Sequence, residues 1–392
     1  MTAGVRDRRA ILGRGFRANP AFELILYDRL PPEERKALAE LRRDPDFYGV
    51  LRPRDGAAAL GVKSVDRETA LLFLTLREPG SLPSYMEALL GEGALGTVSR
   101  LVADGILEVE HGGGFVFGAA ALPLFSGGGE PGEAGAAGSR LAGIALAALR
   151  YGQDLDLDDA LALSYRLYGY NRRPLTPAWK RRLGDGDAVL AWLGLGPGGR
   201  WRQELERGWE SRGPNDWWLS WHSRSSVNNL TGSGATWKLY VSPAPEALPE
   251  SFGAILEALA AARAPQFKVG ADAWGILRAD KIVAYFPSFE GLAAAADALA
   301  SRLSGMPAQG VPFTSEIGGD GLLSWGVDPP REESTLGGES WRLWLTHRLA
   351  RALISAKSMQ SAEPWRFALE RVRLEGVDTD TWTPGAMLWK RN

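Results

Sequence analysis

The chain has 392 residues, 45% of them hydrophobic and 23% charged, which is typical of soluble globular domains with substantial cores. A formal net charge of −2 supplies no basic field for general nucleic-acid binding, and the lack of cysteine excludes disulfides, zinc–thiolate sites and cysteine nucleophiles. The basic N-terminal segment lacks the apolar core of a signal peptide, and no apolar run approaches a membrane span, so we expect a cytoplasmic protein.

The first region, residues 1–122, contains three helical segments and then a hairpin. Helices are predicted for RETALLFLTLR (67–77), SLPSYMEALLG (81–91) and GALGTVSRLVADGI (93–106). The following ILEVEHGGGFVFG alternates on either side of a glycine turn, as a hairpin does. Three helices and a hairpin resemble a winged helix-turn-helix, with LVADGILEVEHGGGFVFG matching its third helix and wing.

The third helix of this region argues against DNA as the ligand. It offers one arginine, Arg100, beside one aspartate, Asp104, whereas contacts to phosphates need several cations. A structural or a peptide-binding role is therefore favoured. Winged helices of similar shape bind leader peptides in ribosomal peptide biosynthesis by adding a strand beside the wing. That resemblance implies contacts by four residues of the hairpin: Leu107, Val109, Phe115 and Phe117.

Residues 123–140 form a predicted flexible linker, because SGGGEPGEAGAAGSR cannot bury enough apolar surface to order itself. Residues 141–209 predict a helical middle region. It carries a polar and aromatic cluster that suits either a solvated helix end or a surface for peptide or phosphate. The cluster comprises Tyr165, Arg166, Tyr168, Tyr170, Asn171, Arg172 and Arg173.

The third region, residues 210–392, alternates strands with alanine-rich helices and predicts an α+β domain with an antiparallel or mixed sheet. The predicted strands are WWLSWHS, TWKLYVS, QFKVG and KIVAYF. Helices are predicted for residues 251–264, 289–303 and 340–358.

A set of cations lies on these strands. Alternation places Lys238 and Tyr240 on one face of TWKLYVS, opposite an apolar face, and Lys268 lies between Phe267 and Val269. Further cations are Arg224, Arg278 and Arg342. Buried like charges repel and lose hydration, so such a set favours an anionic ligand, and a phosphate accepts several charge-assisted hydrogen bonds. The competing interpretation is an ordinary solvent-facing side of an antiparallel sheet.

A lysine among other cations suits proton abstraction, because burial and neighbouring positive charge lower its pKa. With phosphoserine or phosphothreonine bound, such a base takes the α-proton while phosphate leaves the β-carbon. Phosphate-binding loops, hydrolase elbows and metal-spaced histidines are absent from the sequence, so we expect no metal and no organic cofactor.

The stretch from Trp237 to about Pro384 resembles the Hop A-type effector family and its relatives, the stand-alone lyases of class V lanthipeptide and thioamitide biosynthesis. The matching segments are WKLYVSP, ARAPQFKVG, LRADKIVAYF, VPFTSEI, WGVDPP and ERVRLEGVDTDTWTP. The spacing of Lys238, Tyr240 and Lys268 is also similar to bacterial phosphothreonine lyases and the lyase domains of lanthionine synthetases, which carry Lys-x-His on one strand and a base lysine some thirty residues later.

The resemblance implies a role for each residue. Lys268 would be the base and Lys238 a phosphate ligand, with Arg278 and Arg342 as further phosphate ligands. Arg224, which the resemblance does not cover, is a predicted phosphate ligand as a member of the cation set. Tyr240 stands where those lyases have the general-acid histidine, so His222 is a second candidate for the acid.

The implied function is a phosphoserine/phosphothreonine lyase. It would form dehydroalanine or dehydrobutyrine in a ribosomally synthesised precursor peptide that a separate kinase-like partner has phosphorylated. The alternative is a catalytically inactive peptide-binding scaffold or kinase partner, and a third possibility is a DNA-binding regulator.

Overall fold

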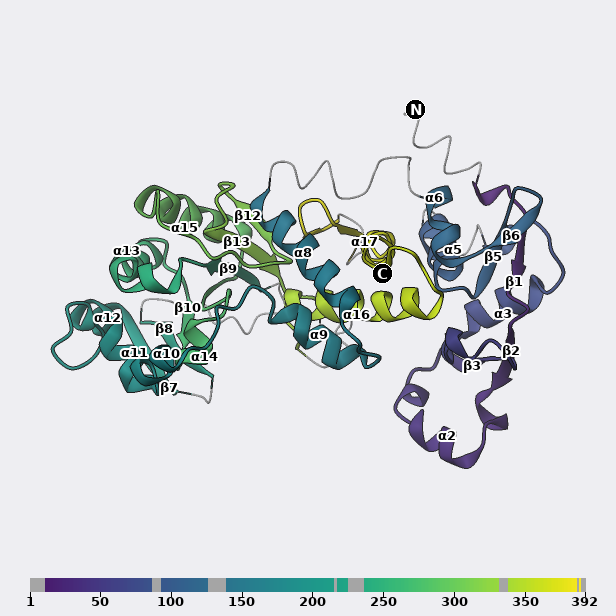
Figure 1. Ribbon diagram of the computed structural model, residues 1–392, viewed down its shortest axis with the longest axis horizontal. Coiled ribbons are helices and arrows are strands. Elements are labelled where there is room, and N and C mark those ends of the chain that lie inside the picture. The colour runs from purple at the N-terminus through teal and green to yellow at the C-terminus, as the bar shows by residue number, and fades with distance from the viewer. Residues whose placement is uncertain are drawn as a thin grey trace. The chain divides into compact units, whose positions relative to one another are not determined.

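The computed structural model describes residues 11–86, 93–125, 139–214, 217–224, 236–330, 338–385 and 388 (Figure 1). The chain divides into two compact units: unit 1 is Met1–Pro131 with Arg351–Glu375, and unit 2 is Gly132–Ala350 with Gly376–Asn392. The predicted limits differ from this division in several respects. Residues 141–209, which we expected as a separate helical region, belong to unit 2. We expected residues 351–375 inside the 210–392 domain, whereas they group with the N-terminal region.

Unit 1 holds two small antiparallel sheets, in the strand orders β1-β5-β6 and β2-β3-β4. Its strands are β1 (Phe16–Ala18), β2 (Phe22–Leu26), β3 (Phe47–Pro53), β4 (Lys63–Asp66), β5 (Leu107–His111) and β6 (Gly114–Val116). Its helices are α2 (Pro32–Ala37), α3 (Arg67–Thr75), α5 (Ala94–Ala103), α6 (Leu122–Phe125) and α17 (Pro364–Leu374).

The predicted hairpin is confirmed as β5 and β6, which turn at Gly112 and Gly113 with φ of 60° and 80°. Helices α3 and α5 match two of the three predicted helices, and Asp66 caps α3 by accepting a hydrogen bond from Thr69 N at 2.7 Å. The third predicted helix, 81–91, lies largely outside the described residues. The winged helix-turn-helix as a whole stays a prediction, and strands β1 to β4 were not anticipated.

The predicted peptide contacts need correction. Strand β5 is the middle strand of its sheet, and the side chains of Leu107 and Val109 are fully buried in the unit 1 core, so they cannot contact a peptide. Phe115 and Phe117 are half-buried; the first stacks with Arg17 at 4.4 Å. Among the described strands β6 lies at the edge of this sheet, so any strand addition would use β6 and not β5.

Helix α17 belongs to unit 1 because it is tied to α5. Arg371 on α17 donates two hydrogen bonds to Asp104, the C-cap residue of α5, at 2.7 and 2.8 Å, and a third to Glu375 at 2.7 Å. A bidentate arginine–carboxylate pair of this kind is strong when partly buried. Val372 and Ala368 of the same helix are fully buried.

Unit 2 is built on a seven-stranded sheet in the order β12-β13-β9-β11-β10-β8-β7, and every neighbouring pair is antiparallel. Its strands are β7 (Trp209–Pro214), β8 (Trp218–Ser223), β9 (Trp237–Val241), β10 (Gln266–Gly270), β11 (Ile282–Phe286), β12 (Ser315–Ile317) and β13 (Leu323–Val327). A short pair, β14 (Val377–Asp378) and β15 (Thr383–Pro384), follows. The predicted α+β class with an antiparallel sheet is confirmed for this unit.

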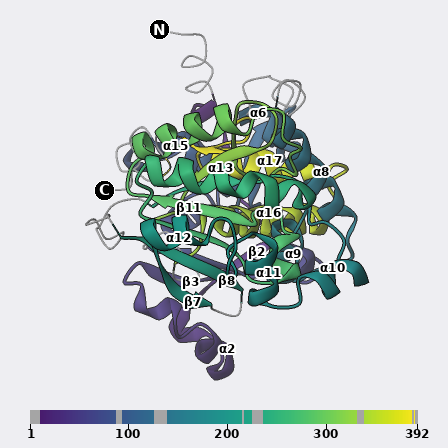
Figure 2. The ribbon, with the colours of Figure 1, turned by 90° about the vertical axis from the view of Figure 1, so that its left-hand side faces the viewer.

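The helices of unit 2 flank this sheet on both sides. They are α8 (Arg140–Asp154), α9 (Ala160–Tyr168), α10 (Pro177–Arg182), α11 (Gly186–Trp192), α12 (Arg202–Gly208), α13 (Leu248–Ala261), α14 (Ala273–Ile276), α15 (Phe289–Arg302) and the first part of α16 (Trp341–Ser358). Figures 1 and 2 show α13 and α15 against one face of the sheet, with α8, α9 and the start of α16 on the other side. No helix among the described residues is both long enough and apolar enough to cross a bilayer.

The face under α13 and α15 carries the main core. Leu239, Ala284 and Phe267 lie in one row across β9, β11 and β10, and all three are fully buried. Trp221 stacks on Phe267 with ring centroids 4.9 Å apart. Because strand side chains alternate, the polar residues between these positions are directed to the second face, toward α9 and α16.

Candidate active site

The register of the sheet brings the three residues of the Lys-x-Tyr…Lys pattern to one face. Tyr240 pairs with Val283, and Val283 pairs with Lys268, across β9, β11 and β10. Lys238 lies in the next row of the same face, opposite Tyr285. All of these strands are internal to the sheet, so the lysines do not lie on solvated edges.

Lys268 is a half-buried amine whose contacts are aromatic rings. Its Nζ lies 4.0 Å from the ring centroid of Trp218 and 5.6 Å from that of Tyr285. Among the described residues it makes no hydrogen bond and no ion pair. Burial, followed by the positive charge of Lys238, lowers the pKa of Lys268 from 10.5 to about 8. Roughly one molecule in ten therefore carries the neutral amine at pH 7.

Lys238 is more deeply buried and is paired. Its Nζ lies 2.5 Å from a carboxylate oxygen of Asp328 and 5.4 Å from the centroid of Tyr285. Asp328 also accepts a hydrogen bond from Trp341 N at 3.1 Å, which fixes the carboxylate at the start of α16. Gly326, opposite Lys238 on β13, leaves space for the indole of Trp341, which a Cβ would meet at 2.8 Å.

A buried carboxylate, Asp280, organises the arginines. It accepts two hydrogen bonds from Arg278 at 2.8 Å each, one from Arg342 at 2.8 Å and one from the Tyr168 hydroxyl at 3.1 Å. Burial opposes the charge of this aspartate, but the two arginines outweigh burial and hold the pKa of Asp280 far below its ordinary value. Arg278 also lies over Trp218, the ring that Lys268 contacts, at 5.1 Å.

This arrangement corrects the predicted role of Arg342. Its side chain is fully buried and donates to Asp280, to the Pro312 carbonyl at 3.1 Å and to the Tyr168 carbonyl at 2.8 Å. Every nitrogen of its guanidinium is engaged, so it positions Asp280 rather than binding a ligand. The side chain of Arg278, by contrast, is partly exposed.

Two tyrosines are candidates for the acid. Tyr240 is nearly fully buried, and burial raises its pKa; Asp328 reinforces the shift while Arg342 opposes it. Tyr285 lies on β11 between the two lysine strands, and burial followed by Asp328 raises its pKa as well. Tyr285 is the more accessible of the two phenols, and its ring lies within 6 Å of both lysine ammonium groups.

His222 lies at the β8 side of this cluster, diagonal to Lys268, whereas Arg224 lies outside the cluster. His222 is on the lysine face but opposite Gln266, and its lowered pKa reflects burial and then Arg212 on the edge strand β7. Arg224 donates to the carbonyls of Glu206 and Trp209, at 3.0 and 3.2 Å. It lines a cavity on the other face, so the predicted phosphate role of Arg224 is wrong.

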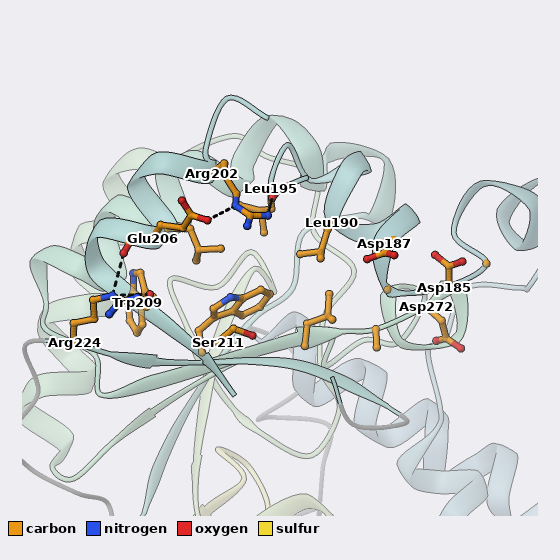
Figure 3. Close-up of a pocket in the computed structure, with 16 residues that line it drawn as sticks. Asp185, Asp187, Leu190, Leu195, Arg202, Glu206, Trp209, Ser211, Arg224 and Asp272 are labelled. Atoms are coloured by element: carbon orange, nitrogen blue, oxygen red, sulfur yellow. Dashed lines mark hydrogen bonds and ion pairs between the residues drawn. The ribbon is translucent and has the colours of Figure 1, made fainter. Parts of the chain in front are cut away.

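That cavity, of about 780 Å³, lies between the core face of β7 and β8 and helices α11 and α12. Figure 3 shows Arg202, Glu206 and Arg224 at one end and three aspartates at the other. Arg202 and Glu206 pair with each other at 2.5 Å, while Asp185 and Asp272 cap α11 and α14. These four charged groups and Arg224 are thus engaged within the protein, and the lysine face is the stronger candidate for chemistry.

Sequence reasoning missed several residues of the site. Asp280 and Asp328 neutralise the cations, Trp218 and Tyr285 contact Lys268, and Tyr168 completes the Asp280 cluster. One signal was present, because Arg278 and Asp280 are two residues apart in LRADK and can pair locally. Among the described residues, no group of three or more acidic or histidine side chains has the geometry of a metal site.

No protein-family model and no curated protein matches the chain. Solved structures similar to it include an effector protein from Pseudomonas syringae pv. tomato strain DC3000, with 12% identity, 63% of this chain and 98% of that one covered, and a TM-score of 0.38. An effector protein from Pseudomonas syringae pv. syringae strain 61 is 13% identical, with 62% of this chain and 98% of that one covered and a TM-score of 0.37. The type III effector/phosphothreonine lyase OspF from Shigella flexneri is 14% identical, with 30% of this chain and 69% of that one covered and a TM-score of 0.26. These likenesses are distant, so the functional argument rests on the site itself.

Proposed function

We propose that the chain is a lyase that removes phosphate by β-elimination from phosphoserine or phosphothreonine in a peptide. One observation carries the proposal: Lys268 offers an amine with a pKa of about 8 and no acceptor among the described residues, close enough to Lys238 and Arg278 for their charges to lower that pKa. Among the described residues of this cluster, the basic side chains of Lys238, Lys268, Arg278 and Arg342 outnumber the carboxylates of Asp280 and Asp328. A phosphate monoester, with a charge of about −1.5 to −2 at pH 7, would balance the surplus.

The reaction needs only groups that the site supplies. Neutral Lys268 takes the proton from Cα, and the electron pair of that C–H bond forms the Cα=Cβ double bond. The Cβ–O bond breaks, and its electrons leave with the bridging oxygen of phosphate. A protonated side chain donates a proton to that oxygen, so the products are a dehydroamino acid and inorganic phosphate.

The cations bind and stabilise the phosphate as it departs. Lys238 and Arg278 flank Lys268 on the same face, and hydrogen bonds from charged donors strengthen as negative charge develops on the leaving group. Burial, and after it their charge, also lowers the pKa of Lys268, so that a part of the amine is neutral before phosphate binds. We assign the proton donor to Tyr285 or Tyr240, and Tyr285 is favoured by its accessibility.

The substrate that we propose is a ribosomally synthesised precursor peptide phosphorylated by a separate kinase. The motif series from Trp237 to Pro384, which resembles the class V lanthipeptide and thioamitide lyases, supports this class. In this proposal unit 1 binds the leader segment at the edge strand β6, which raises the local concentration of the reacting segment.

One observation favours a second function, an inactive peptide-binding scaffold. Asp328 and Asp280 already pair with Lys238 and Arg278, which reduces what these cations gain from a phosphate. The two functions differ in the fate of a phosphopeptide and not in whether it binds.

The test is to incubate the full chain with synthetic phosphoserine and phosphothreonine peptides and to follow their mass. A lyase yields a peptide lighter than the unphosphorylated form by one water, together with free phosphate. A phosphatase would restore serine or threonine instead. Binding without any change of mass, at enzyme excess and over a range of pH, would establish the scaffold and refute the lyase.

A further inference from the structure

Arg172 is a cation next to the proposed phosphate site that none of the steps above uses. It follows α9, and the next residue, Arg173, donates its backbone N–H to the Leu277 carbonyl at 2.9 Å. The chain around Arg172 therefore runs alongside the residue preceding Arg278. The positive charge of Arg278, after burial, lowers the pKa of Arg172, as expected for two like charges held close together.

The turn that presents Arg172 is held in place by side chains. Asn171 has a φ of 64°, in the left-handed region that asparagine tolerates better than most residues. Its Nδ2 donates to the carbonyls of Gln309 and Gly310 at 2.8 and 2.9 Å, and its own carbonyl accepts from Gln309 Nε2 at 2.6 Å. The buried Lys281 in turn donates to Gln309 Oε1 at 2.7 Å. These hydrogen bonds fix the backbone of the turn, and so they fix the position from which the Arg172 side chain extends.

The guanidinium of Arg172 lacks an acidic partner. It lies over the ring of Trp274 at 5.1 Å, and Trp274 is 49% exposed. Among the described residues Arg172 donates no hydrogen bond and forms no ion pair, and its buried Nε is unsatisfied. The nearby carboxylates are engaged elsewhere: Asp280 with two arginines, and Asp272 with the N–H of Gly275 at 2.8 Å.

We propose that Arg172 and Trp274 form a second anion-binding point that accepts the carboxylate of an aspartate or glutamate flanking the phosphorylated residue of the substrate. This inference rests on the proposed function, since it places the flanking residue beside the reacting one. A guanidinium pairs with a carboxylate through two parallel hydrogen bonds, and an aromatic face beneath it keeps the guanidinium partly dehydrated. The substrate class is thus narrowed to phosphopeptides with an acidic neighbour.

The experiment compares three phosphoserine peptides that differ only in the flanking positions, which carry glutamate, glutamine or lysine. The ratio of kcat/KM for glutamate over glutamine is measured for the wild type, Arg172→Met and Arg173→Met. Arg173 is the matched control, an exposed arginine one position along the chain. We expect a wild-type ratio of about ten, arising in KM. The ratio should fall to about one in Arg172→Met and stay near ten in Arg173→Met.

Binding of the same peptides, followed by fluorescence anisotropy, keeps this test separate from that of the lyase. Loss of the glutamate preference in Arg172→Met alone supports the inference even if no peptide is turned over. A wild type that does not distinguish glutamate from glutamine, or an equal loss in both variants, overturns it. Failure of the wild type to eliminate phosphate from any peptide that it binds would instead refute the proposed function.

Discussion

Lys268 on β10 and Lys281 just before β11 are both lysines whose pKa is lowered by burial, to about 8 and about 7. Their surroundings differ in one decisive way. Lys281 is fully buried and donates to the Pro243 carbonyl at 2.9 Å and to Gln309 Oε1 at 2.7 Å. Lys268 is half-buried and contacts the rings of Trp218 and Tyr285.

The comparison teaches that a lowered pKa does not by itself mark a base. The Lys281 amine donates to two acceptors, one of them Gln309. The Gln309 amide in turn donates to the carbonyls of Asn171 and Leu277, so Lys281 helps to hold these segments together. The Lys268 amine is held by aromatic faces that leave its lone pair, once deprotonated, free to accept a proton. We therefore assign chemistry to Lys268 and structure to Lys281.

The largest expected effect comes from removing the base. Lys268→Ala should lower the rate of phosphate elimination by about 10²–10⁴-fold, the usual contribution of a general base. Lys268→Arg should be equally impaired, because a guanidinium stays protonated. Both rates are measured by release of inorganic phosphate, with circular dichroism as the control for folding. A wild-type rate in either variant would remove Lys268 from the mechanism.

Lys281→Ala should have the opposite effect to Lys268→Ala: it should lower the stability of the fold and not the chemistry of elimination. It leaves two buried acceptors unpaired and opens a cavity, so the free energy of unfolding should fall by about 2–4 kcal/mol in urea denaturation. Lys281→Met, which retains most of the volume, is the matched variant and should lose less. Unchanged stability together with abolished elimination would break the distinction between the two lysines.

The cations around Lys268 should affect binding of phosphate. Lys238→Met and Arg278→Met should each weaken binding of a phosphopeptide by about 1.5–3 kcal/mol, with little change for the unphosphorylated peptide. Calorimetry measures both. Arg224→Met removes a cation from the opposite face of the sheet and should leave both affinities unchanged. Equal losses for the two peptides would argue against a phosphate site.

The smallest effect is the pH dependence. Lys268 must be neutral to act, so kcat/KM should rise about tenfold per pH unit below the pKa near 8 and level off above it. Bound phosphate favours the ammonium form, so the midpoint of kcat should lie at a higher pH than that of kcat/KM. A rate that falls as the pH rises from 7 to 9 would be inconsistent with a lysine base.

Much of the second unit could be predicted from alternation and helix caps. The strands containing Lys238 and Lys268 and the helices at 251–264 and 289–303 appear close to their predicted positions. Alternation within one strand also placed Lys238 and Tyr240 on one face. It could not give the pairing of β9 with β11 and β11 with β10, which is what brings Tyr285 between the lysines.

The partners of the cations could not be predicted because they depend on distant segments. Asp328, which directly follows β13, forms an ion pair with Lys238, and Arg342 on α16 forms one with Asp280. Sequence alone therefore counted Arg342 as a free cation, whereas tertiary packing neutralises it. Likewise, the role of β5 as a central strand depends on β1, which the N-terminal sequence did not reveal, and this buries Leu107 and Val109.

The most direct test of the central claim, that the neutral amine of Lys268 takes the α-proton, is chemical rescue of Lys268→Ala by small primary amines. Elimination from a phosphopeptide is measured at several pH values and amine concentrations. The account predicts that the restored rate follows the concentration of the free amine, and that guanidine restores nothing. A rate that follows the protonated amine, or no rescue in a variant that still binds the phosphopeptide, would contradict it.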